Sequence, residues 1–186
     1  MSTEESKKEK YTPATIAVMD KLRQCDDQVV EALKPVFFND NPDKVAKWHN
    51  LFKDPVFFPK QNMTLDEQRD IAYKRLKKVA DAKLFSIYDF INEPKNLLTA
   101  HEMLCLADGA LVTKFTVQFN LFGGTLIALH TDRHRAFMDK VDDLTHMGCF
   151  CFTELGYGNN AVEMETTAIY DQDKQEFVIH SPTTLS

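Results

Sequence analysis

The sequence contains few cysteines, glycines and tryptophans, with 4, 6 and 1 of them among 186 residues. Four scattered cysteines in a chain of this length argue against a disulfide scaffold and indicate reduced thiols in an intracellular compartment. Basic residues are also in deficit, because 22 Lys and Arg face 28 Asp and Glu and give a formal net charge of −6. Nucleic-acid binding normally requires a basic excess, so we expect no nucleic-acid partner.

Long apolar segments are absent as well. The longest nearly unbroken apolar run covers residues 121–129, far short of the roughly 20 residues that span a bilayer. Residues 1–12 are polar and rich in Lys and Glu, without the apolar stretch of a secretory signal. We therefore expect no membrane span and no secretory leader.

The composition is that of a globular chain, with 44% hydrophobic and 27% charged residues, and most of it has helical periodicity. A first helix is expected to begin at Thr12-Pro13 and end at Pro35, and a second to begin at Asn41-Pro42. Residues 64–67 have the form of a capping box at the start of another helix. Further helices are expected over residues 94–108, 109–128 and 132–144.

The pattern changes at Gly148. Residues 149–152 and 165–170 are typical of strands, residues 171–174 of a turn, and residues 176–180 of the returning strand of a hairpin. A loop over residues 154–160 lies between the first two. We therefore predict a mainly α fold with three parts: a polar tail (1–10), an α-helical domain (11–147) and the first strands of an incomplete β-domain (148–186).

Two pairs of metal-ligating residues have simpler explanations than a metal site. His130 and His134 lie four residues apart, a spacing that could share a metal on one helix face. The glutamate of the zinc motif is missing, and Asp132 is better explained as a helix cap. Cys149 and Cys151 would share one face of a strand, but no second pair completes four ligands, so buried thiols are expected. We predict no metal site.

One helix carries a cluster of basic residues, Lys74, Arg75, Lys77 and Lys78. We expect a solvated face with acidic residues one or two turns away, and contact with a phosphorylated ligand is the alternative. The glycine pair Gly123-Gly124 lies inside a helical pattern, where each glycine costs about 1 kcal/mol relative to alanine. Close packing against another helix is the favoured explanation, and close approach to a ligand is the alternative.

The most distinctive local feature is a strand end followed by a polar loop. The Thr153 hydroxyl and the backbone N–H groups freed by Gly156 and Gly158 could bind a planar polar heterocycle and an acyl carbonyl. Asn159 and Asn160 form the polar end of the loop. A plain β-turn is equally compatible, because Gly and Asn both favour turns. The residues alone leave both interpretations open.

Several short motifs follow one another in the second half of the sequence. They are residues 121–124 (LFGG), 131–134 (TDRH), 148–150 (GCF), 153–160 (TELGYGNN), 165–168 (ETTA), 170–171 (YD) and 176–182 (EFVIHSP). In order and spacing this series resembles the acyl-CoA oxidases, the flavoprotein branch of the acyl-CoA dehydrogenase superfamily. The resemblance covers residues 100–186, and the N-terminal helical region resembles the family more loosely.

The resemblance implies a fold and a reaction. The fold is an N-terminal helical domain of acyl-CoA dehydrogenase/oxidase type, a middle β-domain and helical C-terminal domains, with FAD and acyl-CoA between them. The reaction converts acyl-CoA to trans-2-enoyl-CoA in fatty-acid β-oxidation, and oxygen reoxidises the flavin and gives hydrogen peroxide. Hydrogen bonds to the thioester carbonyl stabilise the developing enolate. The family's glutamate base belongs to a C-terminal half that lies beyond Ser186, so we assign no catalytic residue.

The resemblance also assigns binding residues. Matched position by position, Thr153, Gly156 and Gly158 are the residues expected to bind FAD. A second set is expected to bind the acyl-CoA substrate: Asn159, Asn160, Phe122, Gly123 and Gly124. The chain departs from the family at Tyr157, where histidine is more common, and at Asn159, where serine is more common.

We therefore expect the N-terminal part of a peroxisomal acyl-CoA oxidase, inactive as a 186-residue chain and a homodimer in its full-length form. The alternatives are an acyl-CoA dehydrogenase fragment and a non-catalytic helical binding or assembly protein derived from this family. No targeting signal is visible, because the sequence ends in Thr-Leu-Ser and not in a Ser-Lys-Leu address. Peroxisomal location follows from the resemblance alone, and the cytoplasm is the alternative.

Overall fold

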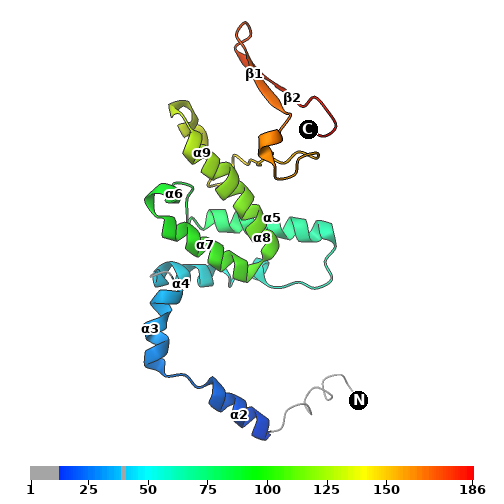
Figure 1. Cartoon of the computed structure of the whole chain (residues 1–186). Coiled ribbons are helices and arrows are strands. Elements are labelled where there is room, and N and C mark those ends of the chain that lie inside the picture. Colours follow the sequence, from blue (N-terminus) through cyan, green and yellow to red (C-terminus); the bar gives the residue numbers. More distant parts are fainter. Residues whose placement is uncertain (1–12, 39–40) are drawn as a thin grey trace. The chain divides into compact units, whose positions relative to one another are not determined.

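The computed structural model describes residues 13–38 and 41–186, and Figure 1 shows their course. The chain forms two compact units, the first ending at Lys114 and the second beginning at Phe115, and each is described by itself. The described part is mainly helical with one small antiparallel sheet, which confirms the predicted fold class. The predicted tail (1–10) and the Thr12 cap lie outside the described residues, and the predicted boundary at 147/148 stays a prediction.

The helices of the first unit are α2 (Pro13–Arg23), α3 (Asp27–Phe37), α4 (Pro42–Leu51), η1 (Pro55–Phe57), α5 (Leu65–Asp81), α6 (Asp89–Asn92), α7 (Pro94–Ala107) and α8 (Gly109–Phe115), whose last residue begins the second unit. Helix α7 packs against α4 and α6 (Figure 1), and η1 packs against α5. The core of this unit is built from fully buried side chains that include Trp48, Val79, Ile87, Met103 and Leu104.

The first helical region departs from the sequence prediction in two ways. The expected single helix is broken after Arg23, because Asp26 caps a new helix and its side chain accepts a hydrogen bond from the N–H of Gln28 at 2.8 Å. Pro35 lies inside α3, which ends at Phe37, so the predicted stop at Pro35 is wrong. A proline near a helix end removes one N–H donor without preventing the last residues from keeping helical dihedrals.

The other helix starts of the first unit agree with the sequence. Helix α4 begins at Pro42 and α7 at Pro94, where a missing N–H is harmless. The capping box of α5 is complete, since the N–H of Glu67 donates to the Thr64 hydroxyl at 3.3 Å and the N–H of Thr64 donates to the Glu67 carboxylate at 2.7 Å.

Arg75 is the exception in the basic cluster that the sequence places on α5. Its side chain is 7% exposed and forms an ion pair with Asp108 at 2.5 Å, across 33 residues of sequence. Its neighbour Lys74 is well exposed and pairs with Asp70 on the same helix. The expectation of a solvated face is therefore wrong for Arg75, which ties α5 to the start of α8.

The second unit begins at the end of α8, where the helix changes from α-helical to π-helical. After α8 the chain forms the π-helical segment η2 (Thr116–Gly123), and the α-helix resumes as α9 (Gly124–Leu129). The next turns are η3 (Asp132–His134) and α10 (Arg135–Met138). The helix predicted over residues 132–144 ends earlier than expected, at Met138, and the residues after it form turns.

The predicted hairpin is present at the end of the chain. After the short helix η4 (Ala161–Glu163), strand β1 (Thr167–Asp171) pairs antiparallel with β2 (Glu176–His180), as Figure 1 shows. In this pairing Thr167 lies opposite His180. Residues 149–152 do not form the predicted strand. A strand requires a hydrogen-bonded neighbour, and the described residues supply none to this segment.

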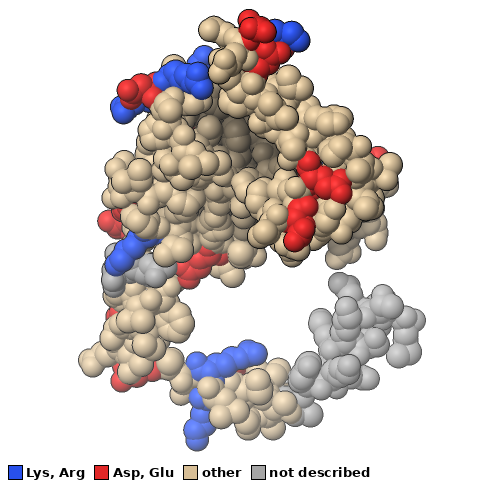
Figure 2. All heavy atoms as spheres, turned by 45° about the horizontal axis from the view of Figure 1, so that its top comes forward, with Lys and Arg blue, Asp and Glu red and all other residues tan. Residues whose placement is uncertain are grey.

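Figure 2 and the described helices show how charge and hydropathy are distributed. On the face shown in Figure 2, acidic and basic side chains lie next to one another in several places, and no broad basic patch is visible there. Among the helices of residues 13–38 and 41–186, none has the length and apolar character needed to cross a bilayer.

Candidate functional site

The loop over residues 153–160 is held in shape by the buried carboxylate of Glu154. This side chain accepts hydrogen bonds from the N–H of Glu165 at 2.8 Å and from the N–H of Thr166 at 2.9 Å. Hydrogen bonds from Thr166 and from the N–H of Glu165 lower the pKa of Glu154 below its ordinary value of 4.5. Because hydrogen bonds to a carboxylate favour its charged form, Glu154 anchors the loop to the start of β1 as an anion.

A second carboxylate, Glu165, ties the loop to the last residues of the chain. The hydroxyl of Tyr157 donates to Glu165 at 2.5 Å, and the hydroxyl of Thr183 donates to its other oxygen. Hydrogen bonding from Thr183 and then from Tyr157 lowers the pKa of Glu165, and the same contact raises the pKa of Tyr157. Tyr157, which departs from the family pattern, thus has a structural partner in this chain.

The two glycines of the loop have local structural reasons to be glycine. The N–H of Gly156 donates to the carbonyl of Leu185 at 2.8 Å, and a β-carbon at 156 would lie 2.8 Å from Cβ of Leu185. Gly158 has φ of +53°, and its N–H donates to the carbonyl of Glu154 at 2.9 Å. Both N–H groups therefore donate hydrogen bonds within the protein. A ligand would meet the exposed side chains of the loop and not free glycine N–H groups.

The exposed edge of the loop carries polar side chains next to the exposed Leu155. The side chains of Thr153, Asn159 and Asn160 are all exposed and present hydroxyl and amide groups that can donate and accept hydrogen bonds. The exposed hydroxyl of Thr153 is of a type that can form a hydrogen bond with a planar polar heterocycle such as a flavin. The structure thus keeps Thr153, Gly156, Gly158, Asn159 and Asn160 together in one short, well-anchored loop.

The predicted substrate-facing helical residues form a separate group. Gly123 is buried at the end of η2 and Gly124 begins α9. The Phe122 ring lies edge-on to Phe137, with 6.1 Å between centroids, and it presses so closely on Gly148 that any β-carbon there would collide with it. Across the described part of the chain, no hydrogen bond or ring contact joins Phe122, Gly123 or Gly124 to the 153–160 loop.

A buried glutamine that the sequence analysis did not single out fixes this second group. The Gln118 amide donates to the carbonyls of His146 at 2.9 Å and Val141 at 3.3 Å, and it accepts the N–H of Gly148 at 3.1 Å. It therefore joins the π-helical segment to the chain that enters the loop. π-helical segments often occur at functional sites, but the sequence offers no signal for either feature beyond the costly glycine pair.

The histidine pair of the sequence analysis makes local contacts. The ring of His134 completes the cap of η3 with Thr131, at 3.0 Å from the Thr131 N–H, so Thr131 takes the capping role expected of Asp132. The ring of His130 contacts the carbonyl of Ile127 at 3.0 Å. Within residues 13–38 and 41–186, no group of three or more His, Cys, Asp or Glu side chains is arranged to hold a metal ion.

The cysteine pair differs from its prediction. Cys149 and Cys151 are both exposed, with 3.2 Å between their sulfur atoms, so the expectation of buried thiols is wrong.

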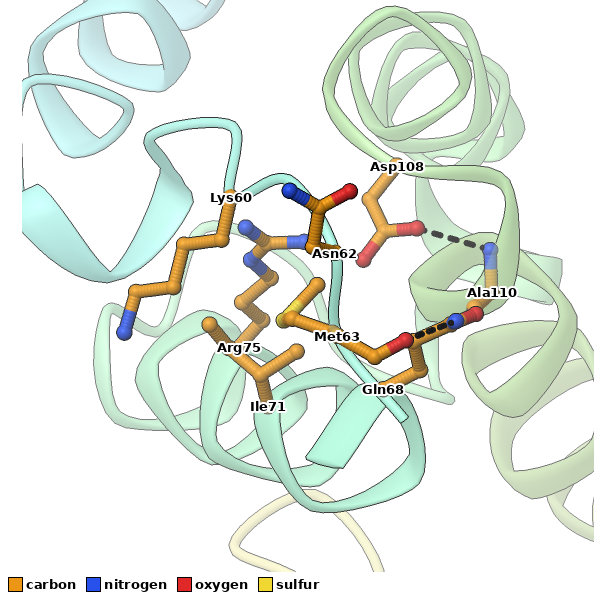
Figure 3. Close-up of a pocket in the computed structure, with 8 residues that line it drawn as sticks. All are labelled: Lys60, Asn62, Met63, Gln68, Ile71, Arg75, Asp108 and Ala110. Carbon is orange, nitrogen blue, oxygen red and sulfur yellow. Dashed lines mark hydrogen bonds and ion pairs between the residues drawn. The ribbon is translucent and has the colours of Figure 1, made fainter. Parts of the chain in front are cut away.

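A pocket of about 330 Å³ lies beside Arg75 in the first unit. Figure 3 shows the Arg75 and Asp108 side chains among its walls, together with Lys60, Asn62, Met63, Gln68, Ile71 and Ala110. Arg75 donates to the carbonyls of Val56 at 2.7 Å and Phe58 at 3.1 Å in addition to Asp108. Because the guanidinium is engaged by three acceptors, its role here is to hold the fold together.

Comparisons with known proteins show which proteins this chain is similar to. The chain is 30% identical to human peroxisomal acyl-coenzyme A oxidase 3 over 134 residues, which is 71% of this chain and 19% of the human protein. It is 32% identical to peroxisomal acyl-coenzyme A oxidase 2 of Arabidopsis thaliana over 148 residues, 78% of this chain and 20% of the plant protein. This chain is homologous to part of the acyl-CoA oxidases.

A third acyl-CoA oxidase extends the comparison to nematodes. The chain is 30% identical to acyl-coenzyme A oxidase acox-3 of Caenorhabditis elegans over 131 residues, 70% of this chain and 19% of that protein. The chain thus spans about a fifth of the length of the acyl-CoA oxidases that it matches. No protein-family model matches the chain, and no solved structure does. The family resemblance of the sequence analysis is confirmed.

Proposed function

We propose that this chain is the N-terminal part of an FAD-dependent acyl-CoA oxidase, which converts acyl-CoA to trans-2-enoyl-CoA and forms hydrogen peroxide in fatty-acid β-oxidation. The observation that carries the proposal is the sequence shared with acyl-CoA oxidases over 70–78% of the chain. The names of the human and plant relatives support peroxisomal location as part of the same proposal.

In this proposal the 153–160 loop lies beside the flavin. FAD, when bound, supplies the two-electron acceptor of the reaction, as cofactors of redox enzymes do. Thr153 would hold the flavin through its exposed hydroxyl, while Gly156 and Gly158 keep the loop in the shape that brings this edge forward. Glu154 and Glu165 are positioning residues, because their carboxylates accept hydrogen bonds that connect the loop to residues 165 and 166.

The substrate-binding role of the second group belongs to the same proposal. Asn159 and Asn160 are assigned to the polar part of acyl-CoA, and Phe122, Gly123 and Gly124 to the wall near its acyl chain. The small volume of the glycine pair suits a wall that the backbone itself must form. We assign no catalytic residue within the chain, since the family's glutamate base belongs to the C-terminal half of the full-length protein, which we expect to be a homodimer.

Two alternatives make different predictions. An acyl-CoA dehydrogenase would pass electrons to another flavoprotein and not to oxygen. A non-catalytic binding or assembly protein would retain the helical region without turnover, and the engaged N–H groups of Gly156 and Gly158 are the observation that favours it.

The experiment that separates them uses the complete product of the gene, purified and supplied with acyl-CoA. We expect stoichiometric flavin absorbance, and enoyl-CoA formation in air without an added electron acceptor. Turnover that requires an artificial acceptor would favour the dehydrogenase, and a colourless protein without turnover would favour the non-catalytic alternative. The 186-residue chain alone is expected to bind little FAD.

A further inference from the structure

Cys149 and Cys151 form a close pair of thiols on an exposed segment. Their sulfur atoms are 3.2 Å apart, and both residues are exposed. A disulfide bond requires sulfur atoms about 2.05 Å apart, so the pair needs an approach of only about 1 Å to form one. Side-chain rotation on a segment without ladder hydrogen bonds can supply that movement.

The surrounding segment keeps the two thiols together. Phe150 and Phe152 lie at alternate positions, with 5.3 Å between their ring centroids, as side chains two residues apart on one side of an extended backbone do. Cys149 and Cys151 occupy the other alternate positions. The hydrogen bond with Cys149 raises the pKa of the Cys151 thiol, so Cys151 ionises less readily and is assigned the second step of the reaction.

The other two cysteines provide a natural comparison. Cys25 lies between α2 and α3 and Cys105 lies on α7, and both are free and exposed. They are therefore as open to small reagents as the pair, but neither has a cysteine within a few residues in the sequence. Exposure does not distinguish the four thiols. Only in the pair is a second thiol close enough to react with an oxidised first thiol and form a disulfide.

We propose that Cys149 and Cys151 are a modification site at which a hydroperoxide such as hydrogen peroxide forms a reversible intramolecular disulfide. In the first step the sulfur of Cys149 attacks one peroxide oxygen, the O–O bond breaks, and a sulfenic acid and one water form. In the second step the sulfur of Cys151 displaces the hydroxyl, which leaves as a second water. Both sulfurs are oxidised, one hydrogen peroxide is reduced to two waters, and a dithiol restores the pair by exchange.

The experiment uses the full 186-residue chain with Cys25→Ser and Cys105→Ser, so that only the pair remains. After treatment with hydrogen peroxide we expect both thiols to be lost together, an intact mass lower by two hydrogen atoms, a monomer on a non-reducing gel, and full recovery of both thiols with dithiothreitol. The matched control carries Cys151→Ser in addition. It should gain oxygen or form linked dimers instead of losing two hydrogens.

Three outcomes would overturn the proposal. The first is that Cys149 and Cys151 both remain free thiols under peroxide treatment strong enough to oxidise Cys25 and Cys105 in the unmodified chain. The second is a mass increase of two or more oxygen atoms on the pair, and the third is a disulfide found only between chains. Circular dichroism of each variant checks that the serine substitutions at these exposed sites leave the helical content unchanged.

Discussion

Glu154 and Thr166 lie 12 residues apart, and the buried carboxylate of the first accepts the N–H of the second at 2.9 Å. The other oxygen of the same carboxylate accepts the N–H of Glu165. Together the two hydrogen bonds fix the shape of the 153–160 loop, which is proposed to contact the flavin. Because the loop has few buried apolar residues, these polar contacts decide its shape.

The pH dependence of the loop follows from the pKa of Glu154. Its folded-state pKa is lowered below 4.5, so its contribution to stability is present above 4.5 and is lost as the pH falls through the folded-state pKa. In an NMR titration, the amide proton shifts of Glu165 and Thr166 should therefore change together with a midpoint below 4.5.

Glu154→Gln should reduce this titration to the part that the Glu165 carboxylate itself contributes, whereas Glu163→Gln, at an exposed neighbouring position, should leave it unchanged. A midpoint at or above 4.5 in the unmodified chain would show that the two N–H bonds do not stabilise the carboxylate.

The Arg75–Asp108 ion pair makes a stability prediction for the first unit. Replacing Arg75 with methionine leaves a mostly buried carboxylate and the carbonyls of Val56 and Phe58 without their partner. We expect the free energy of unfolding to fall by about 3–5 kcal/mol, measured by urea denaturation and the fluorescence of the fully buried Trp48.

Lys74→Met is the matched control on the same helix, because Lys74 and Asp70 are exposed. Its effect should be no more than about 1 kcal/mol. Equal effects of the two substitutions would mean that Arg75 acts as a surface charge.

The contact between Phe122 and Gly148 predicts a double-mutant coupling. Gly148→Ala introduces a β-carbon into the space of the Phe122 ring, and overpacking of this kind typically costs about 1–3 kcal/mol. Phe122→Ala removes the ring, so Gly148→Ala should cost much less in that background, as thermal unfolding of both single variants and the double variant can measure. Strictly additive effects would exclude the contact.

The left-handed backbone at Gly158 gives a prediction for the loop alone. Gly158→Val places a β-branched side chain at φ of +53°, where non-glycine residues cost roughly 1–2 kcal/mol. Gly158→Asn should be tolerated better, since asparagine adopts this conformation more readily. Hydrogen exchange of the Gly158 amide should accelerate in the valine variant and change little in the asparagine variant. An equal acceleration in both would show that backbone conformation is not the reason for glycine here.

The elements that sequence reasoning predicted correctly are those with local signals. Pro42, the Thr64–Glu67 capping box and the turn before Glu176 act within a few residues, and the structure has the expected helix or strand at each. Pro35 and residues 149–152 were predicted wrongly because their structure depends on other residues. The helix that contains Pro35 is formed by the residues before it, and residues 149–152 have no strand to pair with in the described chain. The loop residues from Thr153 to Asn160 could be named from their motif, but their hydrogen bonds could not.

Two long-range contacts, one within each unit, could not be predicted from the sequence. Gln118 reaches Gly148 across 30 residues, and Arg75 reaches Asp108 across 33. Neither side chain belongs to a short motif, and each resembles an ordinary surface residue on a helix until the fold is known. The change from α- to π-helical winding at Thr116 likewise has no local sequence signal.

The yield of hydrogen peroxide tests the proposed function most directly. The complete gene product, incubated with acyl-CoA in air, should form one hydrogen peroxide for each trans-2-enoyl-CoA, because oxygen accepts the two electrons that leave the substrate. Thr153→Ala should lower the bound flavin and the rate while this one-to-one ratio persists. Enoyl-CoA formed without peroxide, or no enoyl-CoA from a flavin-loaded protein, would contradict the assignment as an acyl-CoA oxidase.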